Sequence, residues 1–196
     1  MLATGAIPFM SLFTLPFFLM EVRGYTKLYD NLEEKSVGYT LLSVFCFLMW
    51  NDCLIYWIHR GLHHPLLYKR IHKPHHWWKV STPFASHAFH PLDGFLQGLP
   101  YHLFVFVMPL NKWIFLLAFI MVNMWTISIH DGAFAVPKFL EHIVNGSAHH
   151  VDHHLYFNYN HGQYFTFWDR IGGTFRHPSP LEGKGPLDEL KKAKML

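Results

Sequence analysis

The sequence predicts an all-α fold in which membrane helices, including a helical hairpin, carry a histidine-rich cap. The first observation is composition: hydrophobic residues make up 51% of the 196 residues and charged residues only 15%, which is apolar for a soluble domain. The second is that the 17 histidines outnumber the 16 lysines and arginines. The third is that most of these histidines fall in two blocks, 59–90 and 130–161, which adjoin apolar runs.

The first apolar run, residues 2–20, is uncharged and just long enough to cross a bilayer. A signal peptide is the alternative, but no basic segment precedes the run and no clear small-residue cleavage site follows Met20. Because the chain opens inside this run, we expect an earlier amino-terminal segment to be missing.

The second apolar run, residues 37–58, follows a polar loop at 21–36 and holds Asn51 and Asp52 near its end. Polar groups inside a membrane helix are costly, so they should face the protein interior or serve a function.

Two further apolar runs, 95–110 and 113–129, are separated only by Asn111 and Lys112, which predicts a tight helical hairpin. If both histidine blocks build one site, they lie on the same side of the membrane, and the hairpin must cross twice or dip in and return. Each run gives roughly 25 Å of helix, short of the roughly 30 Å hydrocarbon core, so we expect tilting or partial penetration.

The histidines form three dense motifs, HRGLHH, HKPHH and HHVDHH. Residues three and four apart share a helix face, so each motif can aim several imidazoles at one point. Pro74 indicates that the second motif begins a helix rather than lying inside one. The histidines of the three motifs are His59, His63, His64, His72, His75, His76, His149, His150, His153 and His154.

This set is too large for one metal ion. Imidazole suits zinc, copper, iron and nickel, and three or four ligands satisfy a zinc ion. Nine or more candidates therefore favour two metals, and hence a di-metal cap, over a surface histidine tract. Cys46 and Cys53 lie in an apolar stretch and indicate neither a disulfide framework nor a thiolate site. The formal charge of +3 suits an anionic membrane surface better than nucleic acid.

These motifs carry a family resemblance. H-R-x-L-H-H, then H-x-x-H-H, then H-H-x-x-H-H after an apolar hairpin resembles the sterol desaturase and fatty acid hydroxylase superfamily. The flanks FASHAFHPLDG (84–94) and NYNHGQYFTFWDRIGGTFR (158–176) are similar to the C-5 sterol desaturase branch. The similarity covers roughly residues 37–177, the expected catalytic core of a single 1–196 domain that also includes the segment 1–36 and the tail 178–196.

The resemblance implies a non-haem di-iron oxidoreductase of sterol biosynthesis that converts a delta-7 sterol to a delta-5,7 diene. It implies O2 as the oxidant and electrons from NADH or NADPH through cytochrome b5 and its reductase. It also implies the endoplasmic reticulum membrane, with the metal site facing the cytosol. Carried over motif by motif, it implies the motif histidines other than His149 as ligands, with the choice between His63 and His64 open. His130, in SIHDG, fits a further ligand, and His149 is either a ligand or a supporting residue.

Other polar residues near the motifs are expected to support the ligands or contact the substrate. Carboxylates hold ligand tautomers in many metal sites, although each could equally be a helix cap or a surface charge. These candidates are His87, His90, Asp131, Asp152, His161, Trp168 and Asp169, with Asp52 as a further acceptor.

Three rival functions remain at this point. One is a sterol or fatty acyl C–H hydroxylase of the same superfamily, which shares the motifs. Another is a membrane zinc hydrolase, which needs neither oxygen nor an electron donor. The last is a non-catalytic metal-binding membrane protein.

Two basic clusters carry expectations about partners and location. Lys69, Arg70, Lys73 and Lys79 surround the second motif and could meet either acidic cytochrome b5 or anionic lipid. The terminal KAKML resembles a dilysine retrieval signal of endoplasmic reticulum proteins, with a solvated lysine tail as the alternative.

Overall fold

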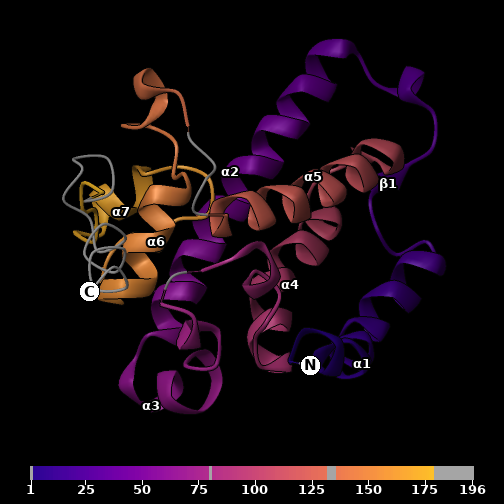
Figure 1. The fold of residues 1–196 in the computed structure, drawn as a ribbon. Coiled ribbons are helices and arrows are strands. Elements are labelled where there is room, and N and C mark those ends of the chain that lie inside the picture. The colour runs from indigo at the N-terminus through magenta and orange to yellow at the C-terminus, as the bar shows by residue number, and fades with distance from the viewer. Residues whose placement is uncertain (1, 80, 132–135, 179–196) are drawn as a thin grey trace, which may run out of the picture.

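The computed structural model describes residues 2–79, 81–131 and 136–178, so the lysine-rich terminal sequence lies outside the described residues. The chain is mostly helical (Figure 1). Its α-helices are α1 (Leu2–Val22), α2 (Val37–Leu62), α3 (Pro65–Leu67), α4 (Pro91–Val107), α5 (Lys112–His130), α6 (Ser147–Tyr156) and α7 (Phe167–Ile171). A π-helical turn covers Tyr68–His72, and 3-10 turns cover Leu32–Glu34, His75–Trp77, Pro83–Ala85 and Lys138–Leu140.

The long helices alternate in direction and build the membrane part. Of the described helices, three are long and apolar enough to cross a bilayer: α1 over Ala3–Val22, α2 and α5. Helix α4 has 17 residues, about 25 Å, and is joined to α5 by the short turn that the sequence predicted, although α4 packs mainly on α1 and α2 rather than along α5. The all-α membrane fold predicted from the sequence is confirmed.

The loops opposite the histidines are tied together. Strand β1 (Leu28–Tyr29) pairs in parallel with β2 (Leu110–Asn111), which joins the loop after α1 to the α4–α5 turn. The Asn111 side chain donates to the Tyr29 carbonyl at 3.3 Å and accepts from the backbone N–H of Trp113 at 3.0 Å. Asn111 therefore caps α5 and closes the turn that the sequence predicted.

Helices α2, α4 and α5 share an aromatic core. The Phe47 ring lies 5.2 Å from that of Phe104 and 6.2 Å from that of Phe115, both edge-on. Helix α1 packs more peripherally on α4, where Phe13 meets Phe95 at 5.3 Å between ring centroids.

The polar pair inside α2 faces the interior. Asn51 and Asp52 are fully buried. Asp52 Oδ1 accepts from the backbone N–H groups of Tyr164 at 2.7 Å and Phe165 at 3.2 Å. These contacts satisfy one oxygen of the buried carboxylate and anchor the 161–166 loop on α2, below the histidine-rich cap.

The second histidine motif departs from a regular helix. His72 ends the π-helical turn, and His75 and His76 lie in the 3-10 turn after Pro74. Proline cannot donate a backbone hydrogen bond and disfavours a continuing helix, so the motif turns back over the end of α2. The third motif lies on α6, a regular helix, as the residue spacing predicted.

Candidate metal centre

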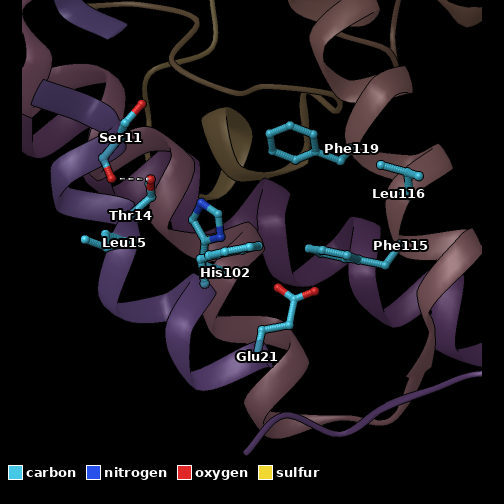
Figure 2. Close-up of a pocket in the computed structure, with 9 residues that line it drawn as sticks. Ser11, Thr14, Leu15, Glu21, His102, Phe115, Leu116 and Phe119 are labelled. Carbon is cyan, nitrogen blue, oxygen red and sulfur yellow. Dashed lines mark hydrogen bonds between the residues drawn. The ribbon is translucent and has the colours of Figure 1, made fainter. Parts of the chain in front are cut away.

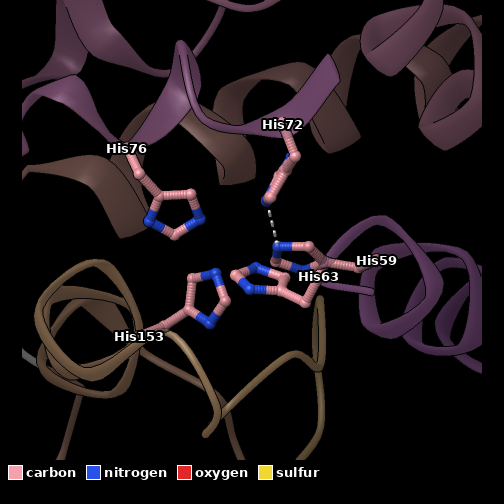
Figure 3. Close-up of side chains that lie close together, drawn as sticks. All are labelled: His59, His63, His72, His76 and His153. Carbon is pink, nitrogen blue, oxygen red and sulfur yellow. Dashed lines mark hydrogen bonds between the residues drawn. The ribbon is translucent and has the colours of Figure 1, made fainter. Parts of the chain in front are cut away.

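Within residues 2–79, 81–131 and 136–178, histidines gather into two compact groups, and in each group one ring nitrogen from every member lies within 4.8 Å of those from the others. The five-histidine group is shown in Figure 3 and brings together α2, the π-helical turn, the 3-10 turn and α6. Its members are His59, His63, His72, His76 and His153. The four-histidine group adds the end of α5, and its members are His75, His130, His150 and His154.

Adjacent histidines in the sequence serve different groups. His76 and His153 belong to the five-histidine group, whereas their neighbours His75 and His154 belong to the four-histidine group. Neighbouring residues on a helical turn point in directions about 100° apart, so an H-H doublet lies between the two groups and supplies both. The spacing predicted that each motif could aim its imidazoles at one point, but α6 directs His150 and His154 to one group and His153 to the other.

Backbone and carboxylate oxygens fix the tautomers in the five-histidine group. Nδ1 of His59 donates to the His161 carbonyl at 2.9 Å, and Nδ1 of His153 donates to the Tyr159 carbonyl at 2.8 Å. A carbonyl can only accept, so the proton of each neutral ring is on Nδ1. The Nε2 atoms therefore present lone pairs.

His72 is oriented by a carboxylate. Its Nδ1 lies 2.7 Å from Asp93 Oδ2, and both side chains are fully buried. Asp93 also accepts from the Gln97 side chain at 2.7 Å through its other oxygen. A carboxylate on the outer nitrogen of a histidine is the usual support of a metal ligand, because it orients the ring and raises its basicity.

The inward nitrogens are spaced as metal ligands. Nε2 of His59 and Nε2 of His72 are 3.1 Å apart, although neither carries a proton to share. Two nitrogens about 2.1 Å from one ion, at right angles, lie about 3.0 Å apart. A cation between them would turn this repulsion into binding, so the donor set fits a metal.

The four-histidine group repeats the pattern with fewer supports. His130 Nδ1 donates to the Thr126 carbonyl at 2.7 Å, which leaves a lone pair on Nε2. That Nε2 lies 2.9 Å from His150 Nε2 and 3.3 Å from His75 Nε2. This spacing also fits nitrogens gathered around one ion.

Burial keeps the imidazoles neutral. Burial, and then the neighbouring His72 imidazole, lower the pKa of His63 to about 2. Burial likewise holds the pKa of His76 and His153 well below the usual range, with nearby imidazoles adding to the shift. Neither ring nitrogen of buried His76 has a hydrogen-bond partner. Neutral rings with unpaired inward nitrogens are competent metal ligands.

Two predicted ligands lie outside both groups. His64 is exposed and caps α3, where its Nδ1 accepts from the backbone N–H of Leu66 at 3.4 Å. Of the pair left open by the sequence, the structure thus brings His63 to the centre. His149 is buried but turned toward Phe175, at 6.0 Å between ring centroids, because its position on α6 points away from the other motifs.

The predicted supporting residues before α6 lie at the edge of the site. His87 is half-buried, and its Nε2 is 3.2 Å from Asn123 Oδ1. His90 is exposed and caps α4 by accepting from the backbone N–H of Leu92. Asp131 follows α5 as its C-cap residue.

Among the predicted supporting residues from α6 onward, His161 is next to the five-histidine group. The His161 ring stands 4.9 Å from His63 and 5.2 Å from His153, between ring centroids. Asp169 supports that loop, since its Oδ1 accepts from the His161 backbone N–H at 2.8 Å. Asp152 Oδ2 accepts from Arg176 at 3.2 Å, and the Trp168 indole packs on Phe167 at 5.0 Å between centroids.

The sequence reasoning missed Asp93. Its signal was present in HPLDG, where an acid stands in the first turn of a predicted helix beside two histidine motifs. First-turn acids usually serve the helix dipole, so spacing alone could not separate the two roles. The carbonyls of Thr126, Tyr159 and His161 carry no side-chain signal at all.

A cavity of about 550 Å³ opens onto the imidazoles. His75, His130 and His150 of the four-histidine group line it, together with His59 from the five-histidine group. Apolar side chains from α1, α4 and α5 form much of its remaining wall. The arrangement can therefore present an apolar substrate to a metal centre.

Comparisons with known proteins identify a family and several similar proteins. A family model described as fatty acid hydroxylase matches residues 44–174. The chain is 60% identical over 189 residues to lathosterol oxidase of Homo sapiens and 61% identical over 188 residues to that of Mus musculus; each alignment covers 95% of this chain and 63% of the relative. It is 56% identical over 179 residues to the Delta(7)-sterol 5(6)-desaturase of Leptosphaeria maculans, covering 90% of this chain and 49% of the relative.

The chain thus spans less than two thirds of the length of these curated relatives. No solved structure matches it.

Proposed function

Because this chain belongs to the fatty acid hydroxylase family, we propose that it is a C-5 sterol desaturase of the endoplasmic reticulum membrane. Its substrate would be a delta-7 sterol such as lathosterol, and its product the corresponding delta-5,7 diene, similar to 7-dehydrocholesterol. The observation that carries the proposal is the pair of buried all-histidine groups opening onto one largely apolar cavity. The relatives, a lathosterol oxidase and a Delta(7)-sterol 5(6)-desaturase, support the choice of reaction.

The two groups are proposed to hold one iron ion each. Iron accepts imidazole ligands, and two iron ions would supply the oxidising power that removes hydrogen from an unactivated C–H bond when O2 is present. The assigned ligands are His59, His63, His72, His76 and His153 for one ion and His75, His130, His150 and His154 for the other.

The proposed reaction balances with an external electron donor. Reduction of O2 to two waters takes up four electrons and four protons. The sterol supplies two of each when two hydrogens leave to form the new double bond. NADH or NADPH, through cytochrome b5, supplies the other two electrons, and the remaining protons come from that donor and the medium.

The chain's own residues orient the proposed ligands and enclose the substrate. Asp93 and the carbonyls of His161, Tyr159 and Thr126 hold ligand protons away from the metal side. The cavity wall places the sterol against the imidazoles and restricts water. No side-chain nucleophile or general base is needed for hydrogen removal.

The decisive experiment is sterol profiling of membranes from cells that lack this activity, with and without the chain. We expect a delta-5,7 diene that appears only with O2 and an electron donor. A hydroxylated sterol would identify the related hydroxylase activity instead, and turnover independent of O2 would identify a hydrolase. Absence of turnover with any donor would leave a metal-binding protein.

Cytochrome b5 is proposed to dock beside the second histidine motif. Lys69, Arg70, Lys73 and Lys79 are all exposed there, and complementary charge mainly accelerates association. Neutralising Lys69 and Arg70 should raise the apparent Michaelis constant for cytochrome b5 at low salt. The effect should shrink near 0.15 M salt, where the screening length is about 8 Å. Loss of membrane association instead would assign these residues to lipid headgroups.

A further inference from the structure

A second cavity continues the first along the membrane helices. It has a volume of about 380 Å³ and is shown in Figure 2. The two cavities share wall residues from α1, α4 and α5, namely Ser11, Thr14, His102 and Phe119. Together they form a passage that starts at the imidazoles and ends between α1 and α5.

The passage follows α1 for most of its length. Ile7 lines the cavity at the histidines, and Glu21 lines the far end of the second cavity. Fourteen residues of helix separate them, or about 21 Å at about 1.5 Å per residue. A sterol is of comparable length, roughly 15 to 20 Å at about 1.5 Å per carbon–carbon bond.

The chemistry of a C-5 desaturation fixes which end of a sterol meets the metals. The hydroxyl oxygen on C3 is only three bonds from C5, whereas the branched hydrocarbon side chain leaves the opposite end of the ring system. A sterol with C5 and C6 at the imidazoles therefore keeps its hydroxyl at the cap. Its side chain must extend away from the cap, along α1.

The bilayer favours the same orientation. The histidine-rich cap lies at one end of the membrane helices, where a sterol hydroxyl meets water, and the passage lies among apolar spans. A sterol of the adjoining leaflet would enter with its hydroxyl at the interface and its tail in hydrocarbon. It would not need to turn over.

Resting on the proposed function, we propose that the second cavity is the binding site for the sterol side chain. Leu15, Phe18, Phe115 and Leu116 supply its apolar wall. Packing of an aliphatic chain against this wall contributes dispersion contacts that are individually small and collectively large. The pocket would make turnover depend on the length of the side chain.

Leu116 and Leu117 offer a matched test. They are adjacent on α5 and 49% and 59% exposed, but only Leu116 lines the passage. Leu116→Trp should fill the second cavity and lower kcat/KM roughly tenfold for a full-length delta-7 sterol. It should leave kcat/KM for a delta-7 sterol without the side chain within about twofold of wild type. Leu117→Trp should leave kcat/KM for both sterols within about twofold of wild type.

Photolabelling of the second cavity tests side-chain binding separately from the proposed reaction. A delta-7 sterol carrying a photoreactive group at the tip of its side chain should label Leu15, Phe18 or Leu116 in the full chain, without turnover. Labelling beside the imidazoles, or equal losses for both sterols in Leu116→Trp, would overturn the proposal. A wild-type chain that is labelled at the predicted residues but makes no diene would refute the proposed function and retain the site.

Discussion

The two histidine groups differ in how firmly they are held and in what they face. Three histidines of the five-histidine group have Nδ1 tied to an oxygen, through His161, Tyr159 and Asp93. In the four-histidine group His130 is tied to the Thr126 carbonyl, whereas Nδ1 of His75 and of His150 have no hydrogen-bond partner.

The cavity divides the groups in the opposite sense. Three members of the four-histidine group line it, but only His59 of the five-histidine group does. The more firmly held group thus forms less of the cavity wall, and the less constrained group faces the proposed substrate. We infer that the five-histidine group would mainly secure its ion, while the four-histidine group would hold its ion beside the substrate cavity.

The largest expected effect comes from removing a ligand. His76→Ala and His153→Ala should each abolish turnover and lower bound iron, because each deletes a buried inward nitrogen. Sterol products and metal content of purified protein measure this. Full activity in both variants would refute the metal assignment.

A smaller effect separates side-chain from backbone support. Asp93→Asn should weaken the hold on His72 and cost about 10- to 100-fold in metal affinity or activity. Thr126→Val is the matched control in the four-histidine group, since the carbonyl that binds His130 is backbone and remains. Iron titration of both variants measures the contrast, and equal losses would contradict it.

An effect of intermediate size is expected on the stability of the fold in acid, through His149, which lies outside both histidine groups. Burial lowers the pKa of His149 to about 4, so between pH 6.5 and 4 the unfolded chain binds a proton there and the folded chain does not. The free energy of unfolding should therefore fall with decreasing pH, by up to about 1.4 kcal/mol per pH unit from this residue.

His149→Gln should flatten that slope in thermal unfolding of detergent-solubilised protein between pH 7 and 5. An unchanged slope would show that other groups account for the acid lability. Because His149 belongs to neither histidine group, the variant separates burial of a neutral imidazole from metal binding.

The smallest effect concerns the doublet at the end of α2. His64→Ala should leave iron content and turnover unchanged within about twofold, because the exposed side chain only caps α3. His63→Ala should lose turnover and lower bound iron, as the other variants of the five-histidine group do. Loss of iron in His64→Ala would contradict the choice of His63.

Much of this architecture follows from the sequence, and the reasons for the exceptions are physical. Apolar runs predict the helices, and the short Asn111–Lys112 joint predicts the hairpin. Spacing also identified nearly all the gathered histidines. It could not divide the doublets between two groups. The π-helical and 3-10 turns around Pro74 change the directions of His75 and His76, and the place of α6 relative to the other motifs depends on the tertiary structure.

The supports were harder to predict than the ligands. Backbone carbonyls such as that of Tyr159 have no residue signature, and Asp93 is separated from His72 by 21 positions in the chain. Asp52 was recognised as costly in a membrane helix, but its contact with the Tyr164 backbone required the tertiary structure.

The most direct test of the two-group account is the iron stoichiometry of the purified chain and two single variants. Iron per chain is measured for wild type, for His153→Ala in the five-histidine group and for His150→Ala in the four-histidine group. The account predicts two ions in wild type and about one in each variant, with the double variant near zero. One ion in wild type, or complete loss of iron in both single variants, would contradict it.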